Sequence, residues 1–365
     1  MKHDKKYIWL DLCRGISALA VLAYHLRNAI FIDFSQLNES SFVEKIFYFT
    51  TSLGHQAVMV FFVLSGFFVG GSILNHKNNF KFKNYLVARL SRLWVVLIPA
   101  LFFTALIDQV SNFYLPGLIG GSFNEILGSG PNMNYSSSIL TFLGNITFLQ
   151  TTYVPPFGTN GPLWSLANEF CYYMLFPMIM IIIGKIQCSF IHKVIYSILI
   201  LIFIIFFAHH FLYGFIIWLF GVAVYIIYTR IDKNYNFWFF LFSAILFCFS
   251  LINSKIDIIK DLLGFSNTTD LIIGFSFAIF LISIKNKNIH GRLEKNIILF
   301  SKWLSDISYT LYVFHLPIVM LIFSLFYSDK QIVFNLSGIM QYLFWMILII
   351  AFTVTLIKSY NNNSF

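Results

Sequence analysis

Long apolar runs separated by short polar stretches recur along the whole chain. A helix needs about 20 apolar residues to cross a hydrocarbon core that is about 30 Å thick, and about ten runs have a suitable length. They lie at residues 8–31, 53–75, 88–107, 164–184, 191–208, 211–229, 237–253, 268–284, 303–327 and 332–357. The pattern predicts an all-α fold, a polytopic membrane helical bundle of about ten transmembrane helices.

One long interruption lies between the third and fourth predicted helices. Residues 108–162 are rich in Gly, Ser, Asn and Pro, and they are too numerous for a simple connection. Residues 139–150 within this stretch are apolar but too few to span a bilayer. They predict a re-entrant or interfacial segment, and the sequence does not decide between the two.

The composition agrees with a membrane protein, because 58% of the residues are apolar and only 11% are charged. If the N-terminus is cytoplasmic, most lysines and arginines fall in inner loops, as the positive-inside rule requires. The outer side then holds only Arg27, Lys45, Lys255, Lys260 and Lys330. We therefore expect both termini in the cytoplasm. Basic residues spread over several loops in this way do not indicate a nucleic-acid partner.

No internal repeat and no soluble segment divides the chain. We expect one transmembrane domain over residues 1–358 and a short cytoplasmic tail over 359–365. The first apolar run is full length and carries charges, which is typical of a retained helix and not of a cleaved signal peptide. The four cysteines lack metal-type spacing, so no metal site is predicted.

The first predicted helix carries three polar groups on one face. At about 100° per residue, Asp11, Arg14 and His25 return to one side of the helix, with Arg14 and His25 roughly 16 Å apart along its axis. Ionisable side chains that face lipid are costly, so this face should line a polar interior. The alternative is a set of satisfied interior groups in which Asp11 and Arg14 pair at i,i+3.

Two further segments carry candidate binding residues. Ser65 and Gly66 lie in a run rich in small residues, which lets a ligand or simply another helix approach closely. Arg89 and Arg92 are spaced i,i+3 at the inner end of the third predicted helix. One guanidinium group can donate two hydrogen bonds to the oxygens of a phosphate, so these arginines suit a phosphate-bearing ligand. The alternative is that they anchor lipid headgroups.

Glu169 lies early in the fourth predicted helix, which starts near Pro162 on the outer side. His25 reaches a similar depth in its own helix, so the two side chains are predicted to pair. A carboxylate beside an imidazole orients the ring and raises its basicity. The alternative is that Glu169 accepts a hydrogen bond from Tyr172 or Tyr173 and only holds helices together.

The ninth predicted helix places Ser308, Tyr312 and His315 on one face, at i, i+4 and i+7. His315 is either a satisfied core histidine or a ligand-binding one. His209 and His210 fall between two predicted spans, where we expect a tight outer turn.

Five segments, in this order and spacing, resemble the acyltransferase-3 family of membrane O-acyltransferases, which modify bacterial surface polysaccharides and lipid-linked sugars. The segments are DLCRGISA with a histidine eleven residues after its arginine, FFVLSGF, RLSR with a following proline, WSLANE and SYTLYVFH. The resemblance implies a bacterial inner-membrane enzyme that takes an acyl group, usually acetyl, from cytosolic acetyl-CoA. It implies His25 as the catalytic residue, and Arg14, Arg89 and Arg92 on the acyl-CoA side. It places Glu169 in an outer motif with Trp164 and Ser165, and the predicted pairing with His25 makes Glu169 the second catalytic candidate. The remaining pathway-lining candidates are Asp11, Ser65, Trp164, Ser165, Ser308, Tyr309, Tyr312 and His315.

The expected reaction moves the acyl group to a hydroxyl of a glycan or lipid-linked sugar. A neutral hydroxyl is a poor nucleophile, and a histidine held by a carboxylate supplies the necessary base near neutral pH. No bound cofactor is expected; the partners are acyl-CoA, the sugar acceptor and membrane lipids, and a homo-oligomer is left open. The alternative function is a transporter or flippase for an anionic or lipid-linked sugar, although the two related halves common in carriers are not evident.

Overall fold

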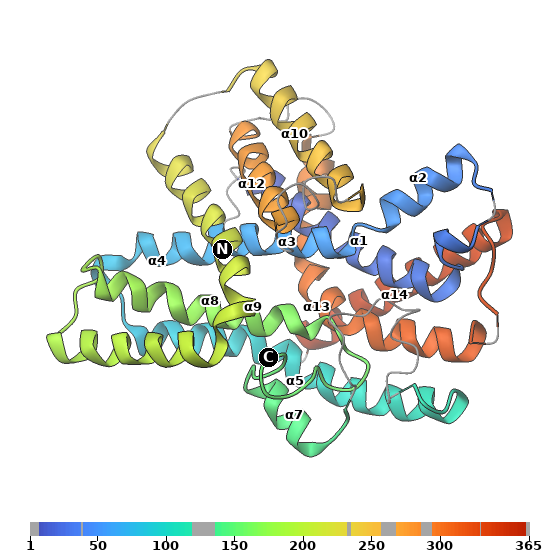
Figure 1. Cartoon of the computed structure of the whole chain (residues 1–365), viewed down its shortest axis with the longest axis horizontal. Coiled ribbons are helices and arrows are strands. Elements are labelled where there is room, and N and C mark those ends of the chain that lie inside the picture. Colours follow the sequence, from blue (N-terminus) through green and yellow to red (C-terminus); the bar gives the residue numbers. More distant parts are fainter. Residues whose placement is uncertain are drawn as a thin grey trace. The chain divides into compact units, whose positions relative to one another are not determined.

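The computed structural model of the chain describes residues 7–37, 39–118, 136–231, 235–256, 268–285, 294–328 and 330–362. This part of the chain forms twelve α-helices and isolated β-bridges, without a strand (Figure 1). The all-α prediction is confirmed. The predicted cytoplasmic tail lies partly outside the described residues, at 363–365.

The helices follow the apolar runs closely. Eight are long and apolar enough to cross a membrane, and the shorter apolar helices Phe190–Ile205 and Thr268–Ser283 correspond to the two other predicted spans. The chain is therefore an integral, multi-pass membrane protein. The elements are α1 (Ile8–Ile30), α2 (Phe42–Thr51), α3 (Gly54–Ser65), the π-helix η3 (Gly66–Gly70), α4 (Gly71–Asn75), α5 (Phe82–Tyr114), α7 (Ile139–Ile146), α8 (Leu163–Ile182), α9 (Phe190–Arg230), α10 (Phe237–Ile256), α12 (Thr268–Ser283), α13 (Glu294–Phe326) and α14 (Leu336–Asn362).

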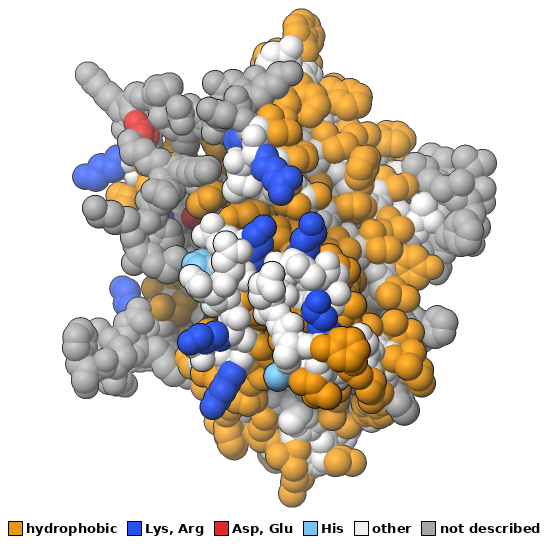
Figure 2. Space-filling model, turned by 90° about the vertical axis from the view of Figure 1, so that its left-hand side faces the viewer, with side chains coloured by type: hydrophobic (Ala, Val, Ile, Leu, Met, Phe, Trp, Pro, Cys, Tyr) orange, Lys and Arg blue, Asp and Glu red, His pale blue; other side chains and the backbone are white. Residues whose placement is uncertain are grey.

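Many large apolar side chains are exposed, as expected where lipid replaces water. Hydrophobic side chains cover most of the described surface in Figure 2. Helix α14 illustrates the pattern, because its exposed residues recur every three or four positions and so form one stripe. This stripe contains Leu336, Met340, Phe344 and Ile347.

Helix α5 is longer than the sequence suggested at both ends. The predicted span covered residues 88–107, whereas the helix runs from Phe82 to Tyr114. The assignment of Asp108 to an outer loop was therefore wrong. No glycine or proline interrupts the sequence between Asp108 and Tyr114, so nothing ends the helix before Pro116.

The turn predicted at His209 and His210 falls on residues 206–210, whose side chains the structure does not describe, and stays a prediction. The apolar helical segments Phe190–Ile205 and Phe211–Arg230 on either side match the two predicted spans. The predicted inside–outside order beyond this point stays a prediction.

Two short helices lie outside the spans. Helix α7 has eight residues and is too short to cross a bilayer, which excludes an eleventh span at this position. Helix α2 begins with a capping box between Ser41 and Glu44, and it lies outside the predicted elements. The backbone N–H and hydroxyl of Ser41 hold the pKa of the Glu44 carboxyl below its usual value.

The chain divides into two compact units. Unit 1 comprises residues 1–14, 58–91 and 168–302, and unit 2 comprises residues 15–57, 92–167 and 303–365. The boundaries fall inside α1, α3, α5, α8 and α13, so these helices contribute to both units.

Close backbone approach dominates the core of unit 1. A Cβ atom added to Gly66 would lie 1.8 Å from the carbonyl oxygen of Trp218, and one added to Gly221 would lie 1.8 Å from that of Val63. Glycine is therefore required at both positions, where α3 and η3 cross α9. Two serine pairs connect α10 with α12: Ser243 donates to Ser283, and Ser276 donates to Ser250.

Unit 2 packs α1 against α13 and α14. Gly15 faces the side chain of Leu304, which a Cβ atom would overlap. The ends of α1 and α14 are tied together because Ile32 donates to the backbone of Ile332, which in turn donates to Ile30. Phe103 of α5 contacts Phe314 of α13.

Candidate functional site

The predicted site residues are distributed over both units. Unit 1 holds Asp11, Arg14, Ser65, Arg89 and Glu169, and unit 2 holds His25, Arg92, Trp164, Ser165, Ser308, Tyr309, Tyr312 and His315. The pairing of His25 with Glu169 joins residues of different units and stays a prediction. The same holds for a single cluster of Arg14, Arg89 and Arg92.

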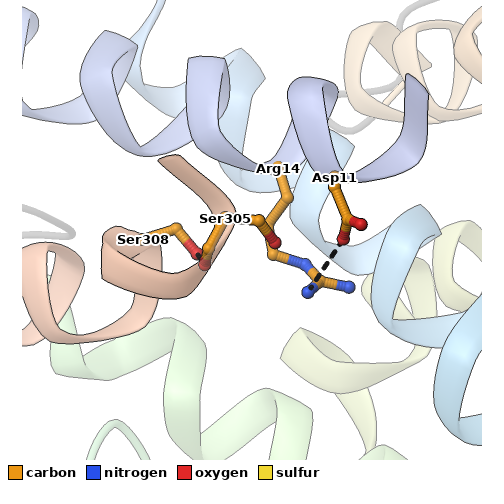
Figure 3. A network of polar contacts seen from close by, with 4 residues as sticks. All are labelled: Asp11, Arg14, Ser305 and Ser308. Carbon is orange, nitrogen blue, oxygen red and sulfur yellow. Dashed lines mark hydrogen bonds and ion pairs between the residues drawn. The ribbon is translucent and has the colours of Figure 1, made fainter. Parts of the chain in front are cut away.

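Arg14 forms an ion pair on its own helix. Its Nη1 atom lies 3.7 Å from Oδ1 of Asp11, one turn earlier (Figure 3). Its guanidinium carbon lies 4.4 Å from the ring centroid of Phe68, in η3. The i,i+3 pair considered from the sequence is therefore present. The ion pair and the aromatic ring together fix the direction of the guanidinium.

Glu169 ends a chain of directed hydrogen bonds. The Tyr173 hydroxyl donates to Oε1 of Glu169 over 2.6 Å, so the hydrogen between this hydroxyl and Ser65 Oγ, 3.1 Å away, belongs to Ser65. Trp218 Nε1 donates to Ser65 Oγ over 3.1 Å. Each donor points toward the carboxylate, and the hydrogen bonds of such a chain strengthen one another. The tyrosine contact named as the alternative for Glu169 is therefore present.

Arg89 contains an orphaned donor. Its Nε atom is buried and has no hydrogen-bond partner in the described structure. The guanidinium carbon lies 5.5 Å from the ring centroid of Tyr85, whose hydroxyl donates to the Tyr173 carbonyl over 3.0 Å. Arg92, one turn later on α5, is exposed. Arg89 thus offers a fixed, partly desolvated cation that suits an anionic ligand.

Two buried histidines face each other in unit 2. The ring centroids of His25 in α1 and His315 in α13 are 5.2 Å apart, with 40° between the ring planes. Exposed fractions are 7% for His25 and 1% for His315. The ring of Tyr24 packs edge-on against His25 at 5.0 Å. The sequence placed both histidines in the membrane but did not bring them together.

The hydroxyl groups of the SYTLYVFH segment bind backbone carbonyls. Ser308 Oγ donates to the carbonyl of Ser305 over 2.7 Å, within α13 (Figure 3). The Tyr309 hydroxyl donates to the carbonyl of Leu93 over 3.1 Å and so connects α13 with α5. The Tyr309 contact therefore stabilises the packing of α13 against α5.

Tyr312 connects α13 with the start of α8. Its hydroxyl lies 2.6 Å from Ser165 Oγ, and both hydroxyls reach the Pro162 carbonyl, at 3.1 and 3.2 Å. One turn of α8 is therefore held against α13. The neighbouring Trp164 stacks on His55, with ring centroids 6.2 Å apart and 18° between planes.

A buried carboxylate in α5, which the sequence pattern did not indicate, holds the same region. Asp108 is fully buried, and its two oxygens accept from the backbone N–H and hydroxyl of Thr159, at 2.8 and 2.6 Å. Asn160 Nδ2 donates to Thr104 Oγ1 and to the Val313 carbonyl, at 3.2 and 2.9 Å. The loop before α8 is thus fixed to α5 and α13. No local pattern signals a contact between residues about fifty positions apart.

Comparisons with known proteins address the family of the chain. The family model described as an acyltransferase domain matches residues 7–359. The acyltransferase MdmB of Streptomyces mycarofaciens is 32% identical over 167 residues, which are 45% of this chain and 37% of MdmB. The peptidoglycan O-acetyltransferase OatA of Listeria monocytogenes is 26% identical over 192 residues, which are 50% of this chain and 26% of OatA. The matches therefore span well under two thirds of either relative.

No solved structure matches the chain significantly. Among the described residues, no group of three or more His, Cys, Asp or Glu side chains lies close enough to hold a metal ion. The family model, however, spans nearly every described helix, from the start of α1 into α14. With its bundle of apolar helices, the chain belongs to the acyltransferase-3 family.

Proposed function

We propose that the protein is a membrane O-acyltransferase that moves an acyl group, usually acetyl, from cytosolic acyl-CoA to a hydroxyl of a cell-surface glycan or its lipid-linked precursor. The observation that carries this proposal is the family match over residues 7–359. The peptidoglycan O-acetyltransferase among the relatives supports a glycan acceptor outside the cytoplasm. A bacterial inner membrane with both termini inside follows from this acceptor and from the distribution of basic residues.

His25 is the proposed general base. The acceptor oxygen attacks the thioester carbonyl, and its proton passes to the imidazole. The carbon–sulfur bond then breaks, and the leaving thiolate takes a proton from the imidazolium. A histidine suits both transfers because it exchanges protons near neutral pH. Its burial supports this role, since water that reached the site would compete as acceptor.

Arg14, Arg89 and Arg92 are the proposed partners of the donor's phosphates. The buried Nε of Arg89, which has no protein partner, supports this assignment most directly. Arg14 is oriented by Asp11 and Phe68. Arginine binds phosphate through two N–H groups at once, so lysine at these positions should restore binding only in part.

Glu169 is proposed to orient the imidazole of His25. It accepts the last hydrogen bond of the chain that runs from Trp218 through Ser65 and Tyr173.

The test combines the purified protein with cells. Release of the CoA thiol from acetyl-CoA by the purified protein in the presence of a soluble glycan acceptor measures use of the donor, and ester-linked acetate on surface glycan of a complemented deletion strain measures transfer. The wild-type protein should do both, and His25→Ala should lower glycan acetylation by about a hundredfold to ten-thousandfold. His76→Ala changes an exposed histidine at the end of α4 and serves as control.

A His25→Ala protein that acetylates glycan normally while inserted in the membrane would contradict the assignment of the base. A wild-type protein that neither releases thiol nor acetylates glycan would contradict the enzyme itself and favour the transporter alternative. No feature of the described structure favours that alternative over acyl transfer.

A further inference from the structure

The polar side chains of the SYTLYVFH segment differ in whether they have a hydrogen-bond partner. The hydroxyls of Ser308, Tyr309 and Tyr312 all reach backbone carbonyl groups. In the described structure, Nε2 of His315 is the buried side-chain atom of this segment without a hydrogen-bond partner. An acceptor or donor left unpaired in a buried place costs about 1–3 kcal/mol. This atom therefore requires an explanation that helix packing does not supply.

The hydrogen bonds of the ring fix what Nε2 can do. Nδ1 of His315 lies 2.8 Å from the carbonyl oxygen of Tyr312 and 3.2 Å from that of Leu311. Carbonyl oxygens only accept, so Nδ1 carries the ring hydrogen. In the neutral ring, Nε2 then presents a lone pair and no hydrogen. A group that binds there must be a hydrogen-bond donor.

The neighbourhood of Nε2 identifies the kind of donor. The ring of His315 is only 1% exposed and lies 5.2 Å from the ring of His25, measured between centroids. A ligand group that reaches Nε2 therefore lies beside the proposed base. The deprotonation step requires a hydroxyl compound at His25, and sugars carry hydroxyls on neighbouring carbons. The second hydroxyl of such a pair is a donor placed next to the first.

We propose that His315 is an acceptor-binding residue whose Nε2 accepts a hydrogen bond from the hydroxyl adjacent to the one that His25 deprotonates. The acceptor class is a polyol with hydroxyls on neighbouring carbons, as in a sugar ring. This inference rests on the proposed acyltransferase function. Fixing one hydroxyl selects which of its neighbours meets the base, so His315 sets both the affinity for the acceptor and the position that is acylated.

The test separates binding of the acceptor from binding of the donor. For each variant, CoA thiol release by the purified protein is measured against the concentration of a soluble glycan acceptor and, separately, of acetyl-CoA, and the KM for each substrate is compared with that of the wild type. His315→Phe and His315→Leu remove the lone pair and keep an apolar side chain of comparable size. His315→Gln replaces Nε2 with an amide oxygen that also accepts. His76→Phe is the control, because Nδ1 of His76 also contacts a carbonyl, that of Ser72, but its ring is exposed.

We expect the KM for the acceptor to rise at least tenfold in His315→Phe and His315→Leu, to recover in part in His315→Gln, and to stay at the wild-type value in His76→Phe, with the KM for acetyl-CoA close to the wild-type value in all four. The site of acetylation, determined by mass spectrometry of the glycan from the complemented deletion strain, should become mixed in the two apolar variants. An unchanged KM for the acceptor in both apolar variants, or an equal rise in the KM for acetyl-CoA, would overturn the proposal. Absence of both thiol release and glycan acetylation in the wild-type protein would instead reject the proposed function.

Discussion

Asp108 in α5 and Glu169 in α8 are both carboxylates within apolar helices, but their surroundings differ. Both oxygens of Asp108 are bound by one loop residue, Thr159, and the side chain is fully buried. Glu169 is partly exposed and ends a chain of side-chain donors that begins at Trp218. A carboxylate bound to loop backbone stabilises one conformation, whereas one at the end of a polarised chain is prepared to hold charge beside a ligand. We infer that Asp108 acts on stability and Glu169 on activity.

Among the variants that test this comparison, Asp108→Ala should lower stability the most. The change leaves two buried donors of Thr159 without an acceptor, which should lower the free energy of unfolding by about 3 kcal/mol. Thermal unfolding of the detergent-purified protein measures this. Asp33→Ala is a matched control, because Asp33 also accepts from a backbone N–H and a hydroxyl, both of Ser35, but is exposed. Equal midpoints for the two variants would contradict a structural role for Asp108.

Gly158→Ala tests the contact between this loop and Asp108 by a change in the loop itself. Gly158 has φ +56°, and an added Cβ would lie 2.0 Å from Oδ2 of Asp108. The left-handed conformation alone costs about 1–2 kcal/mol for a residue with a side chain. Displacement of the carboxylate adds to this cost.

Gly184→Ala separates the two contributions to that cost. Gly184 has φ +74° but nothing within 4 Å of its Cβ position, so this variant carries only the conformational strain. The unfolding midpoint should fall further in Gly158→Ala than in Gly184→Ala. A larger loss in Gly184→Ala would show that the Asp108 contact does not matter.

Glu169→Gln should spare stability and lower activity. Glutamine still accepts from Tyr173 but carries no charge, so we expect glycan acetylation to fall about tenfold, equivalent to 1.4 kcal/mol in the barrier. The unfolding midpoint should stay close to that of the wild type. Glu44→Gln, in the capping box of α2, is the control for removing a carboxylate. A Glu169→Gln protein with normal activity would remove Glu169 from the proposed site and leave it a packing role.

The sequence predicted the spans well but not the long-range polar contacts. Hydropathy identifies the spans because each apolar run is a local property of the chain. The bond from Trp218 to Ser65 and that from Thr159 to Asp108 join distant residues, and periodicity carries no information about such pairs. The same limit explains why His315 was placed on the correct helix face but not beside His25. The capping box of α2 is different, because Ser41 and Glu44 are three residues apart and form a local signal that the sequence does carry.

The smallest effect is expected for the donors behind Glu169. Tyr173→Phe removes the hydrogen bond to the carboxylate, and Ser65→Ala removes the bond that polarises the tyrosine. A single hydrogen bond contributes about 0.5–1.5 kcal/mol, so acetylation should fall a few-fold in Tyr173→Phe and less in Ser65→Ala. If the chain of hydrogen bonds is directed from Trp218 to Glu169, Ser65 acts on the carboxylate only through Tyr173. The double variant should then match Tyr173→Phe alone, and independent, multiplying losses would show that the serine acts by another route.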